Sequence, residues 1–369
     1  MLQTTNALLM TMRHCAKRAF TSRNAQLLLA ASLSAALVGP CGSAANAQEQ
    51  EYATPKPLKP AAQAPIKGFK GSKAARIAYM PPATEFNYYI AIGEGIKAAA
   101  SKRGIETFML APQSGADING QMGMLQDVIS QRVAAIILST HDEHAAAPLV
   151  KRAVAQGIAV VIVNSDIPDF PAPIHGVVGY SQRGGTFKEG QYALKLAAGK
   201  PMKVGILEGQ PGYHSTERCG GFLDAIKGSN LTVVSSLDGK WNVEGGNVAA
   251  MDMLQAHPEI QMIFAANDYE IMGAAQAAKA LGRKDLLLFG NDGDTGAGLE
   301  QIASGNITAT VDTTPFVMGQ IALAVTANVL DNKYQGGWVE TPTDIVDKSN
   351  VLSKLRHPER LYPKPSKKY

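Results

Sequence analysis

The chain contains 369 residues and has a formal net charge of +4 at pH 7, with 35 basic and 31 acidic residues. The excess charge lies near the start, because residues 1–47 contain four basic residues and no acidic one. The rest of the chain is therefore close to neutral, which removes the electrostatic basis for binding nucleic acid. Its length of about 320 residues suffices for two domains of roughly 150 residues each.

Residues 1–47 are predicted to form a signal peptide that is cleaved near Ala47. Arg13 to Arg23 supply positive charges, Leu27 to Val38 form an apolar run, and Ala45-Asn46-Ala47 matches the small-residue pattern of a cleavage site. The apolar run is too short to span a membrane. We therefore expect export of the mature chain to the periplasm.

Cysteines add no evident chemistry to the mature chain. Two of the three, Cys15 and Cys41, lie in the predicted signal peptide. Lipid attachment at Cys41 is an alternative, but Pro40 directly before it is a poor context for processing, which favours soluble export. Cys219 would remain alone, so that no internal disulfide can form. It has no evident histidine partner, and we interpret it as a buried structural thiol.

Residues 48–73 are rich in Pro, Lys, Ala and Gly, with the sequence ATPKPLKPAAQAP at their centre. Because this segment has no apolar periodicity, we predict an extended linker without a core of its own. Residues 361–369 are assigned to a C-terminal tail.

From Ala75 onwards, short apolar runs rich in β-branched residues alternate with segments of helical periodicity. In the first half, strands are predicted at 77–79, 106–110, 134–138 and 158–163, separated by helices at 88–102, 117–130 and 144–156. Residues 186–311 repeat the alternation, and Pro315 opens a helix that runs to about Leu330. This pattern predicts an α/β fold with parallel sheets that helices cover on both faces.

The alternation is expected to form two Rossmann-like lobes joined by a multi-strand hinge. Residues 74–180 and 314–335 are assigned to the N-terminal lobe, and residues 181–313 and 336–360 to the C-terminal lobe. This assignment places the helix after Pro315 back on the first lobe, so that several segments connect the two lobes. Such a hinge would let the cleft between them close on a ligand.

Two polar pairs follow neighbouring strands of the second lobe, Asn267-Asp268 after Met262 to Ala265 and Asn291-Asp292 after Leu286 to Phe289. Parallel strands place both pairs at the carboxyl edge of the sheet, where open α/β sheets bind ligands. Amides and carboxylates at this edge suit a neutral ligand rich in hydroxyl groups. Asn267 and Asp292 could instead be helix caps, and a cap is the preferred interpretation of Asp268.

Five segments between about Ala75 and Val351 form a joint pattern: Phe86 to Tyr89, Val163 to Asp166, Glu217 to Phe222, Phe264 to Asp268 and Gly290 to Gly293. In the same order, they resemble segments of periplasmic sugar-binding proteins of the ribose-binding type, the substrate-binding components of ABC importers. None is diagnostic alone, but their joint order and spacing are specific. The resemblance implies the class I periplasmic binding protein fold, a small-molecule solute between the lobes, a permease or membrane receptor as partner, and no cofactor or metal.

The resemblance also implies which residues contact the ligand. Arg218 would donate to ligand hydroxyls, Asn267 and Asp292 would each bind adjacent hydroxyls, and aromatic rings would cover the apolar faces of a sugar. The full set is Tyr88, Tyr89, Asn164, Asp166, Arg218, Trp241, Asn267, Asp292 and Thr313. Ordinary alternatives are core packing for Tyr89, a surface position for Arg218 and a loop aromatic for Trp241.

The chain departs from the ribose-binding pattern at three places. Asn164-Ser165 replaces an Asp-Arg pair, Phe86 stands where the family has Asn, and Thr313 replaces Gln. Fewer long polar side chains and more aromatic surface suggest a ligand that is less polar than ribose, differently hydroxylated or larger. Deoxy sugars, polyols, inositols and furanose-like signal molecules stay open.

Three functions compete at this point. An exported binding protein that delivers a polyhydroxylated solute to an ABC importer is preferred, and a periplasmic sensor that presents its closed form to a membrane receptor or kinase would share every feature. An enzyme on this scaffold is disfavoured, since no nucleophile elbow or cofactor loop is recognisable. The segment His141-Asp142-Glu143-His144 is interpreted as a loop leading into a helix and not as a metal site.

Overall fold

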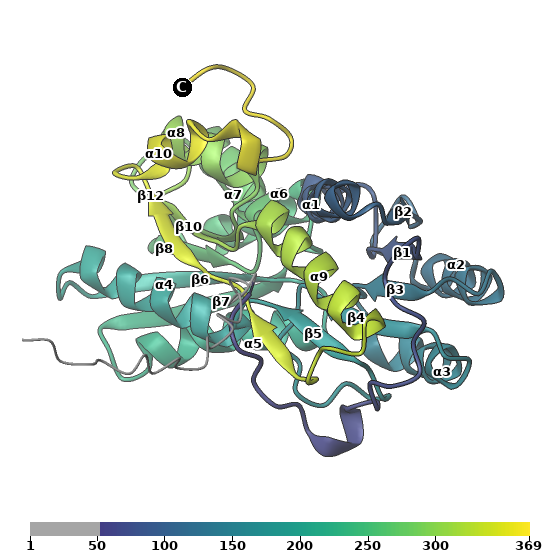
Figure 1. Ribbon diagram of the computed structural model, residues 1–369. Coiled ribbons are helices and arrows are strands. Elements are labelled where there is room, and N and C mark those ends of the chain that lie inside the picture. Colours follow the sequence, from purple (N-terminus) through teal and green to yellow (C-terminus); the bar gives the residue numbers. More distant parts are fainter. Residues whose placement is uncertain (1–51) are drawn as a thin grey trace, which may run out of the picture. The chain divides into compact units, whose positions relative to one another are not determined.

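The computed structural model describes residues 52–369, so that the predicted signal peptide lies outside the described residues. Two six-stranded sheets organise this part of the chain, one in each lobe (Figure 1). Helices cover both faces of each sheet, as the alternation of apolar runs and helical segments predicted. None of the helices in the described range combines the length and the apolarity that a membrane crossing requires.

The sheet of the first lobe is parallel throughout and has the strand order β11-β5-β4-β3-β1-β2. Its strands are β1 (Arg76–Met80), β2 (Glu106–Met109), β3 (Ala135–Leu138), β4 (Ala159–Val163), β5 (Gly176–Gly179) and β11 (Trp338–Glu340). On one face lie the helices α1 (Asn87–Arg103) and α9 (Pro315–Leu330), and on the other α2 (Ile118–Ser130) and α3 (Glu143–Ala155). Since both faces are buried, the central strands are apolar without alternation.

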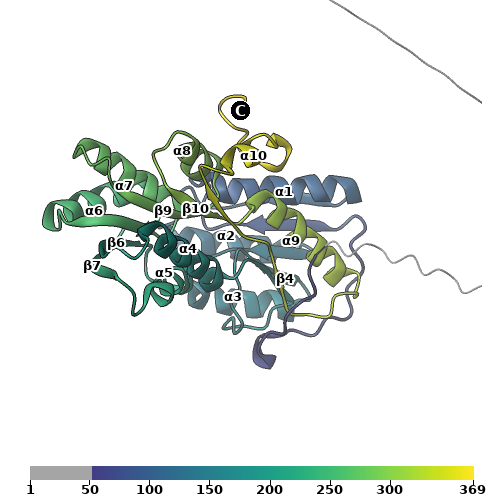
Figure 2. The ribbon, with the colours of Figure 1, turned by 90° about the vertical axis from the view of Figure 1, so that its left-hand side faces the viewer.

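Helices α1 and α9 pack side by side at very short range (Figures 1 and 2). A Cβ atom added at Gly95 of α1 would lie 2.0 Å from the carbonyl oxygen of Phe316, and one at Gly319 of α9 would lie 2.0 Å from that of Ile92. Only glycine allows this backbone approach. The contact fixes α9 to the first lobe, although α9 follows directly after a strand of the second lobe.

The sheet of the second lobe has the order β12-β10-β9-β8-β6-β7, and β12 is its single antiparallel strand. Its strands are β6 (Met202–Glu208), β7 (Leu231–Asp238), β8 (Ile260–Ala265), β9 (Leu287–Asp292), β10 (Ala309–Asp312) and β12 (Asp344–Asp347). Its helices are α4 (Gln182–Ala197), α5 (Tyr213–Ile226), α6 (Val243–Ala256), α7 (Asp268–Ala280), α8 (Glu300–Ala303) and α10 (Val351–Leu355). Helices α4 and α5 pack together, as do α6 and α7.

The described chain passes between the lobes three times, after β5, after β10 and after β11. The first passage leads into α4, the second leads into α9, and the third leads into β12. Three adjacent passages form the multi-strand hinge that the sequence predicted. They allow the lobes to rotate against each other while each sheet stays intact.

One lobe assignment is corrected by the sheet pairing. Residues 336–360 were expected in the C-terminal lobe, but β11 pairs in parallel with β5 of the first lobe, with Trp338 opposite Val177. After β11 the chain crosses to the second lobe, where β12 pairs with β10. Three residues of strand are too few to show a hydrophobic period, which is why the sequence does not reveal this pairing.

The extended linker predicted for residues 48–73 is wrong for the part that the structure describes. Lys56 and Trp338 exchange two backbone hydrogen bonds of 2.7 Å, and Ala64 N donates to Ile174 O at 2.7 Å. Leu58, Ala62 and Ala64 are buried, and Leu58 joins the core beneath α2 and α3. Residues 52–73, purple in Figure 1, are therefore a strap bound to the first lobe and its edge strand.

Candidate functional site

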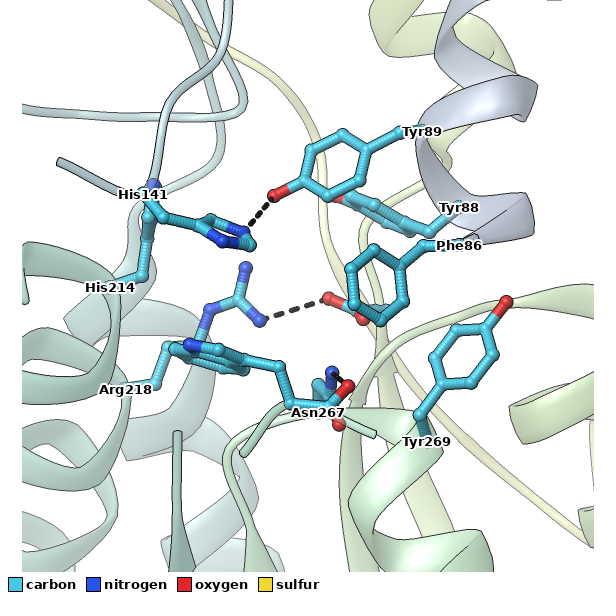
Figure 3. A pocket seen from close by; sticks show the side chains of 10 residues that line it. Phe86, Tyr88, Tyr89, His141, His214, Arg218, Asn267 and Tyr269 are labelled. Carbon is cyan, nitrogen blue, oxygen red and sulfur yellow. Dashed lines mark hydrogen bonds and ion pairs between the residues drawn. The ribbon is translucent and has the colours of Figure 1, made fainter. Parts of the chain in front are cut away.

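A cavity with a volume of about 360 Å³, part of which is open to solvent, lies between the two lobes. The first lobe supplies aromatic and histidine side chains, and the second supplies an ion pair, an amide and further rings (Figure 3). The lining residues are Phe86, Tyr88, Tyr89, His141, His214, Arg218, Trp241, Asn267, Tyr269 and Asp292. Six of the nine sequence-predicted contact residues are among them.

The start of α1 forms the aromatic wall of the first lobe. Tyr88 and Tyr89 are buried in the first turn of the helix, and Phe86 precedes it. The hydroxyl of Tyr88 donates to Asn164 Oδ1 at 2.8 Å and lies 2.9 Å from Thr313 Oγ1. Asn164 and Thr313 therefore lie behind Tyr88 and support it, and they do not line the cavity.

Arg218 and Asp292 form a buried ion pair in the wall of the second lobe, with Arg218 Nη1 3.0 Å from Asp292 Oδ1. Arg218 also donates from Nε to Gln182 Oε1 at 2.7 Å and from Nη1 to Ala266 O at 3.0 Å. Burial raises the pKa of Asp292 to about 7, while the guanidinium of Arg218 lowers it. Asp292 has a φ of 143°, an unusual value for a residue with a side chain, at the end of β9.

Asn267 caps a helix, which was the alternative interpretation of this residue. Its Oδ1 accepts from Glu270 N at 2.8 Å and caps α7, and its Nδ2 donates to Trp241 O at 3.0 Å. Asn267 still lines the cavity, and one proton of its amide is left for a ligand. The cap interpretation of Asp268 is wrong, because its Oδ2 instead accepts from Gly293 N and Asp294 N, both at 2.9 Å. These bonds fix the turn that follows Asp292.

Trp241 covers the cavity from the loop between β7 and α6. Its backbone has a φ of 61°, and its N–H donates to Glu270 Oε1 at 2.9 Å. The indole lies against Gly209, where an added Cβ atom would be 2.0 Å from the ring. It also stacks on His141, with centroids 6.2 Å apart and an interplanar angle of 25°. Trp241 is thus a buried wall of the cavity and not a loose loop aromatic.

Asp166 is not among the residues that line this cavity. Its carboxylate accepts from Tyr213 OH at 3.0 Å and from Gln182 N at 3.0 Å, so that it links the loop after β4 to the second lobe. Burial raises the pKa of Asp166 to about 6. Asp166 was predicted as a ligand contact, and the structure places it at the junction between the lobes.

Four lining residues were not predicted as ligand contacts: Phe86, His141, His214 and Tyr269. Tyr269 joins the lobes, since its hydroxyl accepts from Asn87 N at 2.8 Å and lies 3.2 Å from Asp294 Oδ2. Burial lowers the pKa of His141 to about 4, so that its ring is neutral. The available signal for His141 was its position just after the carboxyl end of β3, which corresponds to the position of Asn267 just after β8 in the other lobe.

Two α/β lobes, a three-segment hinge and a polar cavity with aromatic walls between the lobes together define a protein of the two-lobed solute-binding class. The family model for the periplasmic binding protein domain matches residues 77–334. The chain therefore belongs to the periplasmic binding protein family, which confirms the resemblance seen in the sequence.

Individual relatives agree with this assignment. The chain is 30% identical over 246 residues to the ribose import binding protein of Bacillus subtilis, which covers 67% of this chain and 78% of the relative. It is 30% identical over 284 residues to the D-ribose/D-allose-binding protein of Pseudomonas aeruginosa, covering 73% and 88%. A crystal structure of an ABC transporter periplasmic solute binding protein from Actinobacillus succinogenes 130z, with bound D-allose, aligns with a TM-score of 0.71 at 25% identity, covering 76% and 99%.

Proposed function

We propose that this protein is an exported periplasmic binding protein that captures a small polyhydroxylated ligand, a sugar, deoxy sugar or polyol, and delivers it to the permease of an ABC importer. The observation that carries the proposal is the buried Arg218–Asp292 pair, which faces aromatic rings from both lobes within one cavity. The relatives named for ribose and allose support a sugar as the ligand. The predicted signal peptide supports the periplasmic location.

The side chains divide the recognition of such a ligand between two kinds of contact. Phe86, Tyr89 and Trp241 offer ring faces against which the C–H faces of a sugar can be buried. Arg218 uses Nε and Nη1 for protein partners, which leaves the Nη2 protons to donate to ligand hydroxyls. Asp292 accepts from hydroxyls through its remaining lone pairs, and a charged acceptor makes the stronger bonds.

Closure of the lobes couples these contacts to the hinge. Several hydrogen bonds already cross between the lobes, among them those from Tyr213 OH to Asp166 and from Asn87 N to Tyr269 OH. A ligand that bonds to both lobes adds to these contacts only when the lobes are closed. It therefore shifts the population towards the closed form that a permease would recognise.

The first test is identification of the solute that copurifies with the chain from Gln48 onwards, by mass spectrometry after denaturation. Protein stripped of ligand is then screened by thermal shift against sugars and polyols. We expect one ligand at a stoichiometry near one per chain that raises the melting temperature. Arg218→Met should abolish the shift, whereas Arg356→Met, at an exposed arginine outside the cavity, should preserve it.

A second measurement separates transport from binding alone. Cells that lack the gene should lose uptake of the identified solute, and the wild-type gene should restore uptake while the Arg218→Met variant does not. Stripped protein that shows no shift with any sugar or polyol, and that copurifies with none, would contradict the proposal. Normal uptake in the deletion strain would contradict delivery to an importer.

A further inference from the structure

Gln182 is buried at the point where the chain first enters the second lobe. It is the first residue of α4 and follows the passage that begins at the end of β5. The residue is 0% exposed, and it is not among the residues that line the ligand cavity. Because a buried amide has to satisfy its oxygen and its nitrogen within the protein, the partners of Gln182 indicate what it does.

The amide oxygen of Gln182 is an acceptor for Arg218. Oε1 accepts from Arg218 Nε at 2.7 Å and from Tyr180 OH at 2.9 Å, which uses both of its lone pairs. The bond to Nε is shorter than those from Nη1 to Ala266 O and to Asp292 Oδ1, which are both 3.0 Å. Among the described residues, Gln182 is therefore the acceptor that holds Nε.

The nitrogen atoms of Gln182 reach back to the first lobe. Nε2 donates to Asn164 O at 3.2 Å, and the backbone N–H donates to Asp166 Oδ2 at 3.0 Å. Both acceptors follow directly after β4. The side chain of Asn164 in turn accepts from Tyr88 OH at 2.8 Å, in the aromatic wall of the cavity. Hydrogen bonds thus connect the first-lobe wall with Arg218 by a route behind the cavity.

The orientation of the Arg218 guanidinium depends on these acceptors. The group is planar, so that acceptors on Nε and on Nη1 together fix both its plane and its rotation within that plane. Figure 3 shows the guanidinium pointing into the cavity. Nη2 is the nitrogen that remains for a ligand, and its bonds weaken steeply when the angle at the hydrogen departs from linearity. Without the acceptor at Nε, the plane can tilt and Nη2 loses its aim.

We propose that Gln182 is a positioning residue of the ligand site, which holds Arg218 in the orientation in which Nη2 faces the ligand and is itself held by bonds to the first lobe. The inference rests on the proposed function, since it takes Arg218 as a ligand contact. An amide suits this position because it accepts from Arg218 while it donates to Asn164 O. It also adds no charge to the buried pair of Arg218 and Asp292.

The principal variant is Gln182→Met, which keeps the length of the side chain and removes both polar ends. Gln121→Met is its matched control. Gln121 of α2 is 2% exposed, donates to two backbone carbonyl oxygens and accepts from Thr140 Oγ1, and these bonds lie within the first lobe. Both variants should lower the midpoint of urea unfolding, since each leaves buried partners unpaired. A role in stability alone predicts no other difference between them.

The first readout is the Nε–Hε resonance of Arg218 in ligand-stripped protein that contains isotope-labelled arginine, assigned by its absence from Arg218→Lys. A buried, hydrogen-bonded N–H exchanges slowly with water, so that the wild-type resonance should be protected. Gln182→Met should speed its exchange by about tenfold or more, whereas Gln121→Met should leave it unchanged. Gln182→Glu, which keeps an oxygen at the same place, should preserve the protection.

The second readout is affinity, measured by calorimetry with D-ribose and D-allose as probes. Gln182→Met should bind the probe about tenfold or more weakly than the wild type, and Gln121→Met should stay within about twofold. Gln182→Asn is a milder variant for the case that Gln182→Met does not fold. It keeps an amide that is one methylene too short to reach Nε, and it should show the same losses.

The outcomes separate this inference from the proposed function. Affinity within about twofold of the wild type in Gln182→Met or Gln182→Asn would overturn the positioning role, as would an equal loss of affinity in Gln121→Met. Protection that survives in both Gln182→Met and Gln182→Asn would overturn it as well. If stripped wild-type protein binds neither sugar and copurifies with no solute, the proposed function fails, and the resonance still decides whether Gln182 holds Arg218.

Discussion

The buried pair of Arg218 and Asp292 allows a quantitative test of how the site is built. Both side chains are 5% exposed, so that Arg218→Met would leave Asp292 without a counter-charge in a dry environment. Removing one partner of a buried pair typically costs about 3–5 kcal/mol, because an uncompensated charge remains, whereas replacing both partners costs much less. We expect Arg218→Met to lower the free energy of unfolding by about 3–5 kcal/mol and the double variant Arg218→Met/Asp292→Asn to lower it by only about 1–2 kcal/mol.

The cost of Arg218→Met should also depend on pH. Burial holds the pKa of Asp292 at about 7, above its ordinary value of 3.8, and Arg218 is the main influence that lowers it. A carboxyl group with a raised pKa contributes stability that is fully present below its unfolded pKa and is lost as the pH rises through its folded pKa. Without Arg218 the folded pKa rises further. The destabilisation should therefore be smaller at pH 5, where Asp292 can take up a proton, than at pH 8.

The assay is urea unfolding of ligand-stripped protein, followed by far-ultraviolet circular dichroism at pH 5 and pH 8. Equal slopes against urea are required for the variants to be compared. Arg356→Met is the control for loss of an exposed arginine. The reasoning is refuted if Arg218→Met costs less than about 1 kcal/mol at pH 8, or if the double variant costs as much as the two single substitutions added together.

Three further predictions concern packing, a spectroscopic signal and the strap. Gly319→Ala should cost about 3 kcal/mol in urea unfolding because its Cβ would meet Ile92 O at 2.0 Å, whereas Gly123→Ala in open space on α2 should not destabilise. Trp241 is one of two tryptophans, so ligand binding should change the fluorescence of the wild type but not of Trp241→Phe. Leu58→Ala should cost about 2 kcal/mol in thermal or urea unfolding if the strap is part of the first lobe, and nothing if that segment is a free tether.

The strands and helices were predictable because each carries its own signal. A buried parallel strand such as β4 is a run of β-branched residues, and an amphipathic helix such as α1 repeats its apolar face along a single segment. The strap and β11 lack such a signal. They are held in place by backbone hydrogen bonds between Lys56 and Trp338, which lie 282 positions apart in the sequence. A short segment with few apolar residues shows no hydrophobic period of its own.

The site was predictable to the extent that its residues follow strand ends or match a family segment. Arg218, Asn267 and Asp292 satisfy that condition and lie together in the cavity. His141 comes from the first lobe and stacks on Trp241 of the second, a contact between distant segments that no local pattern in the sequence shows. Asp166 was predicted to contact the ligand but does not line the cavity, because Tyr213 of the other lobe binds its carboxylate at the junction between the lobes.

The distribution of hydrogen bonds in the site gives a physical reason for coupling between closure and binding. The strong groups of the second lobe are satisfied internally, since Arg218 bonds to Asp292 and Asn267 bonds to Trp241. The groups that these side chains leave for a ligand are the Nη2 protons of Arg218 and one amide proton of Asn267, which have no protein partner among the described residues. A polar group that is closed off from water without a partner costs about 1–3 kcal/mol, so that closing without a ligand is penalised. A ligand that bonds to these groups removes the penalty in the closed form, and this differential affinity is the condition for a ligand to drive the lobes together.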